Sequence, residues 1–203
     1  MKITIFGATG HVGSRITAEA LRRGHQVTAV SHSGKTVPGT TPAQANFDDT
    51  PAVVELANDA DVLVISIPPS RTTDESIEVN LNAHQRLIDA APDTRIVVVG
   101  GAGSLLVDGV PLRDTPGFPE AYRREATWGI ELLEHYRRVN DEVDWLVVSP
   151  SPEIGPGERT GNYVVGTDSP AGQQVSTEDF AVGIVDEIEK PAHHRMRITL
   201  ADK

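Results

Sequence analysis

The chain has 203 residues, no cysteine, 18 lysines and arginines, 29 aspartates and glutamates, and a formal net charge of −11. This length suits one well-cored domain, and the lack of cysteine excludes disulfides, thiolate metal sites and a cysteine nucleophile. The acidic charge and an aromatic content of 4% disfavour nucleic-acid binding. No stretch resembles a signal peptide or reaches the roughly 18 apolar residues of a membrane span, so we expect a cytoplasmic protein without membrane contact.

Short apolar runs alternate with apolar residues at helical spacing, a pattern typical of βα units around a buried parallel sheet. Strands are predicted at residues 3–6, 27–30, 62–67, 96–99 and 145–148, with a weak strand at 45–47 and a loop at 31–42. Helices are predicted between residue 12 and Gly24, near 51–57, from Ile77 to Ile88, and around Trp128, Leu132 and Tyr136. The tail is predicted as an irregular segment, a helix that carries Phe180, Ile184 and Ile188, and a strand near 196–200.

This alternation predicts an α/β protein with a doubly wound parallel sheet in a single Rossmann domain. Residues 1–150 would form the dinucleotide-binding core, and residues 151–203 a small substrate cap with a final helix and strand. Ligands of such sheets bind beyond the carboxyl ends of the strands. The functional residues are therefore expected at residues 7–13, 31–35, 66–71, 100–105 and 149–163.

The strongest local signal is the sequence GATGHVG, which places Gly7, Gly10 and Gly13 between the first strand and the first helix. Gly7 permits a tight turn, Gly10 lets the backbone approach a pyrophosphate, and Gly13 allows close packing of helix on strand. The helix amides and the positive end of the helix dipole then face the phosphates. The loop therefore predicts dinucleotide binding, and its other candidate contacts are Thr9, His11 and Val12.

The GxxGxxG spacing resembles the extended and atypical branches of the short-chain dehydrogenase/reductase superfamily. Residues 79–91 (VNLNAHQRLIDAA) and 97–105 (VVVGGAGSL) look like a helix of that superfamily and its fifth strand with the serine-bearing loop. The blocks GGAGSL, DTPGFPEAY, SPSPEIGPGERTGNY and STEDFAVGIVDEIEKPAH are similar to a bacterial subfamily named NADH-flavin reductases, related to biliverdin reductase B and NmrA-like proteins. The resemblance implies a Rossmann fold, a nicotinamide cofactor and a flavin-reductase type of activity.

The end of the second strand carries no acidic residue that could hold a ribose 2′-hydroxyl, which favours NADP(H) over NAD(H). NADP-dependent relatives often carry arginine where His32 stands. The donors available for a 2′-phosphate are Ser31, His32, Ser33 and Lys35. A plain solvated loop is the alternative interpretation of this segment.

Phe47 and Asp48 resemble the pair that binds the adenine in the superfamily, with the carboxylate accepting from the adenine amino group. Asp48 and Asp49 also precede a helix that begins near Pro51. Asp48 is therefore a candidate for either adenine binding or helix capping.

Classical members of the superfamily use a serine and a YxxxK pair, in which lysine lowers the pKa of the tyrosine so that it can pass a proton. Ser104 and Tyr122 are the candidate catalytic residues, but the fourth residue after Tyr122 is Ala126, and the fourth after Tyr136 is Asn140. We therefore do not expect Tyr–Lys catalysis, and epimerase or dehydratase chemistry depends on the same pair. A flavin, quinone or linear tetrapyrrole needs only a hydride at close range and a proton from water.

In this interpretation the small-molecule acceptor lies between several strand ends. Ser104 would bind the acceptor or the nicotinamide carboxamide, and the loop at 149–163 would cover the acceptor with Glu153, Arg159 and Tyr163 as possible contacts. The residues expected around the nicotinamide are Ser66, Ile67, Pro68, Gly100 and Gly101. Each of these side chains also has a purely structural interpretation: Ser104 would stabilise a turn, Tyr122 would pack in the protein interior, and His84 and Asn80 would have structural roles.

A non-catalytic sensor of NADP(H), as in NmrA-like proteins, is the alternative function, since the missing lysine fits it equally well. The adjacent histidines His193 and His194 point to opposite faces of an extended segment, and no carboxylate cluster surrounds them in the sequence, so we expect no metal. No GxSxG or HExxH motif supports hydrolysis. The sequence leaves the oligomeric state open.

Overall fold

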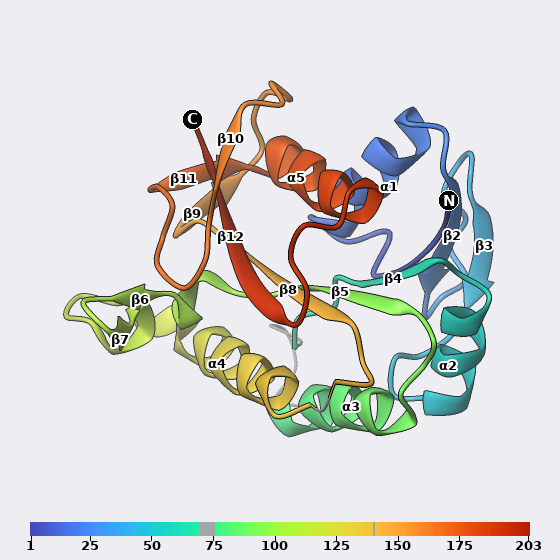
Figure 1. Ribbon diagram of the computed structural model, residues 1–203, viewed down its shortest axis with the longest axis horizontal. Coiled ribbons are helices and arrows are strands. Elements are labelled where there is room, and N and C mark those ends of the chain that lie inside the picture. Colours follow the sequence, from blue (N-terminus) through green and yellow to red (C-terminus); the bar gives the residue numbers. More distant parts are fainter. Residues whose placement is uncertain (70–75, 140) are drawn as a thin grey trace.

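An eight-stranded sheet forms the centre of the protein, and helices cover both of its faces (Figure 1). The structure is a computed structural model that describes residues 1–69, 76–139 and 141–203. The strand order is β10-β12-β8-β5-β4-β1-β2-β3, and all neighbouring strands are parallel except β10 and β12. The bounds of these strands are Lys2–Phe6 (β1), Gln26–Ser31 (β2), Thr41–Gln44 (β3), Val62–Ile65 (β4), Arg95–Val99 (β5), Trp145–Pro150 (β8), Tyr163–Gly166 (β10) and Met196–Asp202 (β12).

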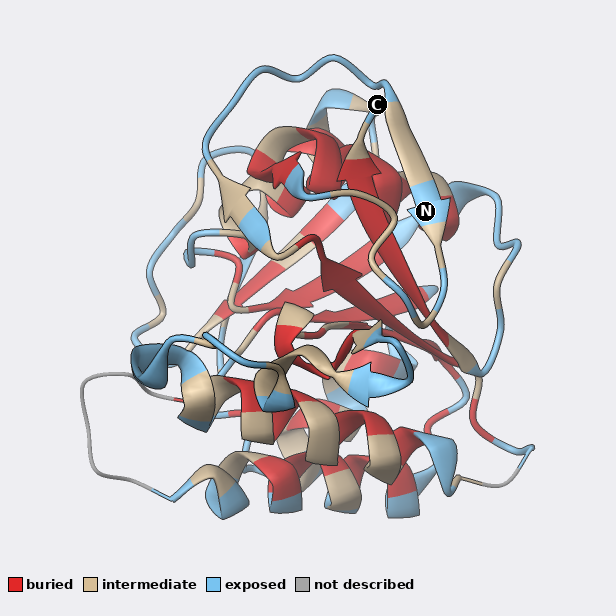
Figure 2. Cartoon of the chain, turned by 90° about the vertical axis from the view of Figure 1, so that its left-hand side faces the viewer, coloured by how far each residue is buried: buried red, intermediate tan, exposed pale blue. Residues whose placement is uncertain are grey.

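Two hydrophobic cores lie on opposite faces of the sheet. Helices α1 (Gly13–Arg22) and α5 (Thr177–Glu189) cover one face, where Ile5, Ile16 and Ile184 are fully buried. Helices α2 (Thr50–Asn58), α3 (Ile77–Ala90) and α4 (Arg123–Arg137) cover the other face. The central strands β1, β4, β5 and β8 are buried on both sides (Figure 2), which is why their sequences are continuous apolar runs rather than alternating ones. The predicted doubly wound α/β fold is confirmed.

Three sequence predictions about strands were wrong in detail. The third strand lies at Thr41–Gln44 rather than at 45–47, because its position is set by pairing with Thr28–Ser31 of β2. The fourth strand ends at Ile65 rather than at residue 67. Three short strands occupy the tail that was predicted as irregular: β9 (Glu153–Gly155), β10 and β11 (Gln174–Ser176). They are too short and too exposed to carry a clear hydrophobic period, and only pairing with distant segments defines them.

The remaining elements lie after β5. A small hairpin joins β6 (Leu106–Val107) to β7 (Val110–Pro111) through Asp108 and Gly109, both with positive φ, as a two-residue hairpin turn requires. Short 3-10 helices span Ala102–Ser104 (η1), Leu112–Asp114 (η2) and Glu120–Tyr122 (η3). Within the described ranges, no helix combines the length and the apolar character needed to cross a bilayer.

His84 and Asn80, both on α3, have structural contacts. The His84 side chain is fully buried, its Nδ1 lies 3.0 Å from the hydroxyl of Tyr136, and burial lowers its pKa to about 3. Asn80 donates to the carbonyl of Ile67 and accepts from the indole nitrogen of Trp128 at 2.8 Å. These bonds tie the segment after β4 to helices α3 and α4.

Candidate functional site

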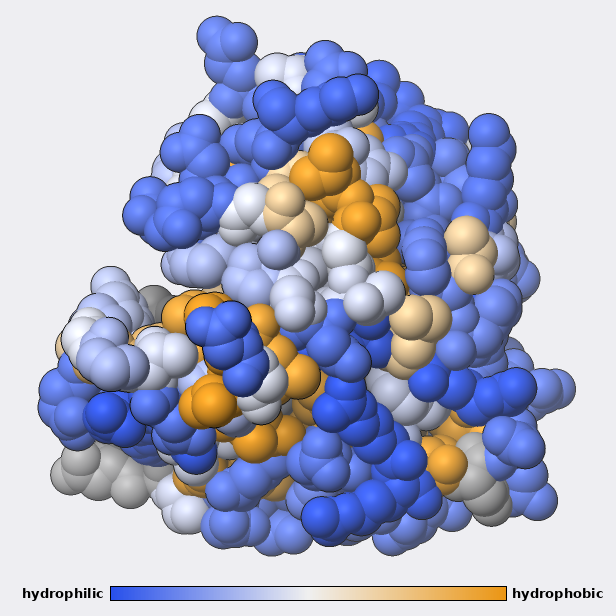
Figure 3. Space-filling model, turned by 60° about the vertical axis from the view of Figure 1, so that its left-hand side comes forward, coloured by the Kyte–Doolittle hydropathy of each residue, from blue (hydrophilic) through white to orange (hydrophobic). Residues whose placement is uncertain are grey.

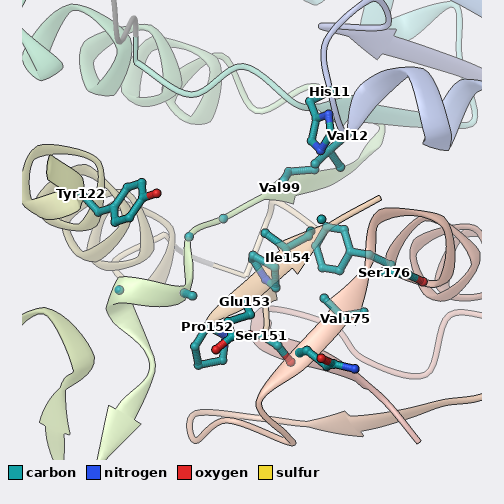
Figure 4. Close-up of a pocket in the computed structure, with 18 of the residues that line it drawn as sticks. His11, Val12, Val99, Tyr122, Ser151, Pro152, Glu153, Ile154, Val175 and Ser176 are labelled. Atoms are coloured by element: carbon teal, nitrogen blue, oxygen red, sulfur yellow. The ribbon is translucent and has the colours of Figure 1, made fainter. Parts of the chain in front are cut away.

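A cleft of about 1600 Å³ opens at the carboxyl ends of the parallel strands. In Figure 4 His11 and Val12 enter it from the glycine loop, Tyr122 from the start of α4, and Glu153 and Ile154 from the segment after β8. Figure 3 shows apolar atoms gathered in separate groups on both sides of the hollow on this face. The cleft lies where a doubly wound sheet binds its ligands.

The glycine loop is shaped by contacts that exclude larger side chains. Gly7 has a φ of 81°, and a Cβ there would lie 2.3 Å from the carbonyl oxygen of Ser66. A Cβ on Gly13 would lie 2.1 Å from the carbonyl oxygen of Gly7. The N–H of Gly10 donates to the same carbonyl at 2.9 Å, which closes the turn. Glycine at these positions therefore permits the close packing of the β1–α1 connection on β4.

The start of α1 fits an anionic group. No side chain among the described residues caps this helix, and its first turn contains no acidic residue. Gly10 and His11 at the tip of the loop are exposed and line the cleft. Backbone amides at the tip of a loop and the positive end of a helix dipole are the groups that bind a pyrophosphate, so the residues present fit a dinucleotide.

The loop after β2 lies beside the glycine loop, since the N–H of Gly7 donates to the carbonyl of Val30 at 3.3 Å. The hydroxyl of Ser31 accepts from the backbone N–H of Lys35 at 2.9 Å, which folds the loop back on itself. The side chains of His32, Ser33 and Lys35 are exposed. None of these four residues lines the cleft as it stands.

Helix capping at α2 falls to Asp49, whose carboxylate accepts from the N–H of Ala52 at 3.4 Å. Asp48 is exposed, and Arg86 donates to its backbone carbonyl at 3.0 Å. Asp49 therefore caps the helix, and the carboxylate of Asp48 is left as a candidate contact for adenine.

The structure brings part of the predicted site together in the cleft. The predicted residues that line it are Gly10, His11, Val12, Ser66, Pro68, Gly100, Gly101 and Tyr122. The predicted residues that do not line it are Gly7, Thr9, Gly13, Ser31, His32, Ser33, Lys35, Asp48, Ile67 and Ser104. Ser70 and Arg71 of the predicted segment 66–71 lie outside the described residues.

Ser104 lies behind the wall of the cleft and is linked to it by a hydrogen bond to Gly101. Its side chain is buried, its hydroxyl donates to the carbonyl of Gly101 at 2.9 Å, and it accepts from Nη1 of Arg197 at 3.1 Å. Gly101 lines the cleft, whereas Ser104 lies behind it. The hydroxyl is therefore placed to hold the β5 loop in shape.

Tyr122 is the exposed aromatic residue of the cleft, with 54% of its surface accessible. It stands at the end of η3, immediately before α4. Ala126 follows one turn later, is buried, and lines the same cleft. The position at which a YxxxK pair would carry its lysine is thus filled by the methyl group of an alanine.

The segment after β8 contributes Glu153 to the cleft, but two of its predicted contacts are used elsewhere. Arg159 binds Glu19 of α1 through Nε at 2.7 Å and Nη2 at 2.9 Å. This hydrogen bonding, together with bonds from Arg22 and Arg23, holds the pKa of the Glu19 carboxyl well below its usual range despite burial. The hydroxyl of Tyr163 donates to Asp186 at 2.5 Å.

Sequence reasoning missed a whole wall of the cleft. Residues 115–119, a proline- and glycine-rich connection, line it together with Leu112, and Gln174–Ser176 and Phe180 line the side formed by β11 and α5. The only signal in the sequence was the accumulation of proline, glycine and phenylalanine after a strand end, which predicts a rigid surface loop but not its partner.

The two histidines near the C-terminus bind separate carboxylates. The Nδ1 of His193 lies 2.6 Å from Glu187, and the Nδ1 of His194 lies 2.9 Å from Asp144. No group of three or more potential metal ligands occurs among the residues that the structure describes.

Residues 7–191 match the protein family described as NAD(P)H-binding. The chain belongs to this family. It is also 33% identical to YwnB of Bacillus subtilis (strain 168), a protein named as uncharacterized, over an alignment of 215 residues that covers 100% of this chain and 99% of YwnB. The family match confirms the predicted likeness to the atypical short-chain dehydrogenase/reductases. It also shows that the cofactor class of the family is a nicotinamide dinucleotide.

Solved structures of the same fold cover nearly the whole chain. A proposed exported protein from Burkholderia pseudomallei is 36% identical, with a TM-score of 0.86 and coverage of 99% of both chains. A proposed NADH-flavin reductase from Streptococcus pneumoniae TIGR4 is 30% identical, with a TM-score of 0.84 and coverage of 100% of both chains. A proposed epimerase from Bacteroides thetaiotaomicron is 32% identical, with a TM-score of 0.86, covering 99% of this chain and 96% of that one.

Proposed function

We propose that this NAD(P)H-binding protein is an oxidoreductase that passes a hydride to a planar acceptor such as a flavin or a quinone. The observation that carries the proposal is the continuous cleft, which runs from the glycine loop past Gly100 and Gly101 to walls of proline, glycine and aromatic residues. The family match and the likeness to the streptococcal protein support it.

The dinucleotide would be held by groups that surround the start of α1. Backbone amides after Gly10 bind the pyrophosphate, and the exposed loop Ser31–Lys35 binds a 2′-phosphate, so NADP(H) is favoured over NAD(H). Asp48 would contact the adenine through its exposed carboxylate. Ser66, Ile67 and Pro68 at the end of β4, with Gly100 and Gly101 at the end of β5, would form the walls around the nicotinamide.

The reduced nicotinamide supplies a hydride when it is bound. The residues of the chain would then hold a flat acceptor by stacking against Tyr122 and the proline-rich walls, while Ser104 positions the Gly101 carbonyl from behind. Because Ala126 stands where a YxxxK pair has its lysine, Tyr122 lacks the partner with which such a pair passes a proton. Water in the open cleft would supply the proton. The same substitution argues against epimerase chemistry of the Tyr–Lys type.

The proposal is tested by following NADPH oxidation with riboflavin, FMN and 1,4-naphthoquinone. We expect rates well above those of the protein-free buffer, and a change of no more than about threefold in Tyr122→Phe, because a proton drawn from water does not need the phenol. Protein that binds NADPH by fluorescence yet oxidises it with none of these acceptors would contradict the proposal and favour the sensor function.

The cofactor preference is tested by fluorescence titration of NADPH and NADH. We expect NADPH to bind at least tenfold more tightly, and the preference to narrow in Lys35→Ala but not in Lys190→Ala, a matched exposed lysine just after α5. A tenfold preference for NADH would overturn the assignment of the loop at 31–35.

A further inference from the structure

The part of the cleft beyond the nicotinamide walls carries many apolar and proline side chains. On one side it is lined by Leu112, by the segment from Thr115 to Pro119 and by Tyr122, and on the other by Pro150, Pro152 and Ile154. Rigid proline rings and an aromatic ring offer stacking area at little cost in side-chain entropy. Such walls suit a planar ring system rather than a flexible polar substrate.

The charges in the same cleft have one dominant sign. Five of its lining residues are carboxylates, namely Glu125, Glu153, Glu158, Asp179 and Asp202, whereas Lys203 is its one lining lysine or arginine among the described residues. Asp179 and Asp202 are engaged by backbone N–H groups, of Gly161 and of Ser176 respectively. Glu153 and Glu158 are exposed, and no ion pair joins either of them to a cation within the described part of the chain. Their fields therefore act directly on whatever enters the cleft.

Three arginines that adjoin cleft residues in the sequence are already paired. Arg113 binds Asp114 at 2.8 Å, Arg123 binds Glu120 at 2.9 Å, and Arg159 binds Glu19 at 2.7 Å. A bidentate arginine is the usual protein partner of a phosphate or carboxylate. An anionic acceptor would therefore meet the exposed carboxylates of Glu153 and Glu158, and it would have to break an existing ion pair to gain one of these three guanidinium groups as a partner.

We propose that this cleft selects planar acceptors that carry no negative charge: riboflavin over FMN, and 1,2-naphthoquinone over its 4-sulfonate. This inference rests on the proposed function and deepens it, because it names the acceptor class. In the reaction, NADPH loses a hydride to the acceptor ring, the acceptor takes one proton from water, and NADP⁺ and the two-electron-reduced acceptor are the products. The phosphate or sulfonate takes no part in this balance, so each matched pair isolates the effect of charge.

Binding and turnover are measured separately for each matched pair. Binding uses quenching of flavin fluorescence by protein saturated with NADP⁺, which cannot turn over, and turnover uses kcat/KM with NADPH. We expect riboflavin to exceed FMN at least fivefold in both measurements at low ionic strength. The gap should narrow as salt is raised, since the Debye length falls to about 10 Å at 0.1 M. The naphthoquinone pair should show the same order in kcat/KM.

The variant Glu153→Gln/Glu158→Gln should reduce the riboflavin-to-FMN ratio at least threefold, whereas Glu55→Gln on α2, an exposed glutamate outside the cleft, should leave the ratio as it is. The inference would be overturned if FMN bound as tightly as riboflavin or more tightly, or if neither flavin bound. It would also be overturned if the riboflavin-to-FMN ratio changed neither with salt nor in the double variant. Failure of the proposed function gives a different result: neither flavin is reduced, while the binding comparison still decides the charge preference.

Discussion

Arg197 on β12 donates from Nη1 to the hydroxyl of Ser104 at 3.1 Å, across a separation of 93 residues in the chain. The Arg197 side chain has an exposure of 0%, and its other bonds go to the carboxylate and carbonyl of Asp168. Burial lowers the pKa of this guanidinium, while the hydrogen bonds that it donates to Asp168 oppose that shift. Because Ser104 in turn donates to Gly101, the last strand of the sheet supports the loop that lines the cleft.

We predict that Arg197→Met lowers the free energy of unfolding by about 2 kcal/mol, since it removes the buried hydrogen bonds from the guanidinium to Asp168 and to the Ser104 hydroxyl. Urea denaturation measures the loss. Arg195→Met is the matched control, because the ion pair of Arg195 with Asp141 is at the surface and should contribute less than about 0.5 kcal/mol. A loss below about 1 kcal/mol in Arg197→Met would show that the buried network is dispensable.

The two glycines at the start of α1 should respond differently to alanine. In Gly13→Ala the new Cβ would meet the Gly7 carbonyl at 2.1 Å, so the loop cannot keep its shape and the melting temperature should fall by several degrees. In Gly10→Ala the nearest atom is 3.2 Å away, so the fold should survive. NADPH affinity should nevertheless fall at least tenfold, because the methyl group blocks close approach of a phosphate. Calorimetry and fluorescence titration separate the two effects, and an unchanged affinity in Gly10→Ala would contradict the proposed phosphate site.

Glu19 joins α1 to the segment that covers the cleft. Its buried carboxylate accepts from Arg22, Arg23 and Arg159, so Glu19→Gln should reduce the free energy of unfolding by about 2–4 kcal/mol. Limited proteolysis should also cut the variant faster near Arg159, because that arginine loses its anchor. Glu55→Gln serves as the surface control here as well. Equal stability of Glu19→Gln and wild type would mean that the three arginines find other partners at no cost.

The buried His84 should make stability depend on pH. Burial lowers the pKa of His84 from 6.5 to about 3. At a pH between these two values, His84 is therefore protonated in the unfolded chain and neutral in the folded chain. The contribution of His84 is therefore complete above pH 6.5 and is lost as pH falls, with a slope that approaches about 1.4 kcal/mol per pH unit. His84→Gln should flatten the curve of unfolding free energy between pH 6.5 and pH 5. A slope equal to that of wild type, or the same flattening in the exposed His32→Gln, would contradict this account.

The sequence by itself determined the helices, the buried strands and the glycine loop, because these depend on local physics. The period of apolar residues identifies the buried strands and the amphipathic helices, and the glycine loop is a short stretch of chain whose geometry excludes side chains at Gly7 and Gly13.

Only the tertiary structure decided what lies opposite these elements. The positions of β3 and β10 depend on the strands that they pair with, and the wall at residues 115–119 becomes part of a cleft only because the segment after β8 lies across from it. The sequence predicted that Ser104 and Arg159 contact the acceptor. In the structure Ser104 is bound by Arg197, and Arg159 is bound by Glu19, both of which lie far away in the chain. Hydrogen bonds and ion pairs between distant residues leave no period or spacing in a sequence, so their partners emerge only when the sheet is assembled.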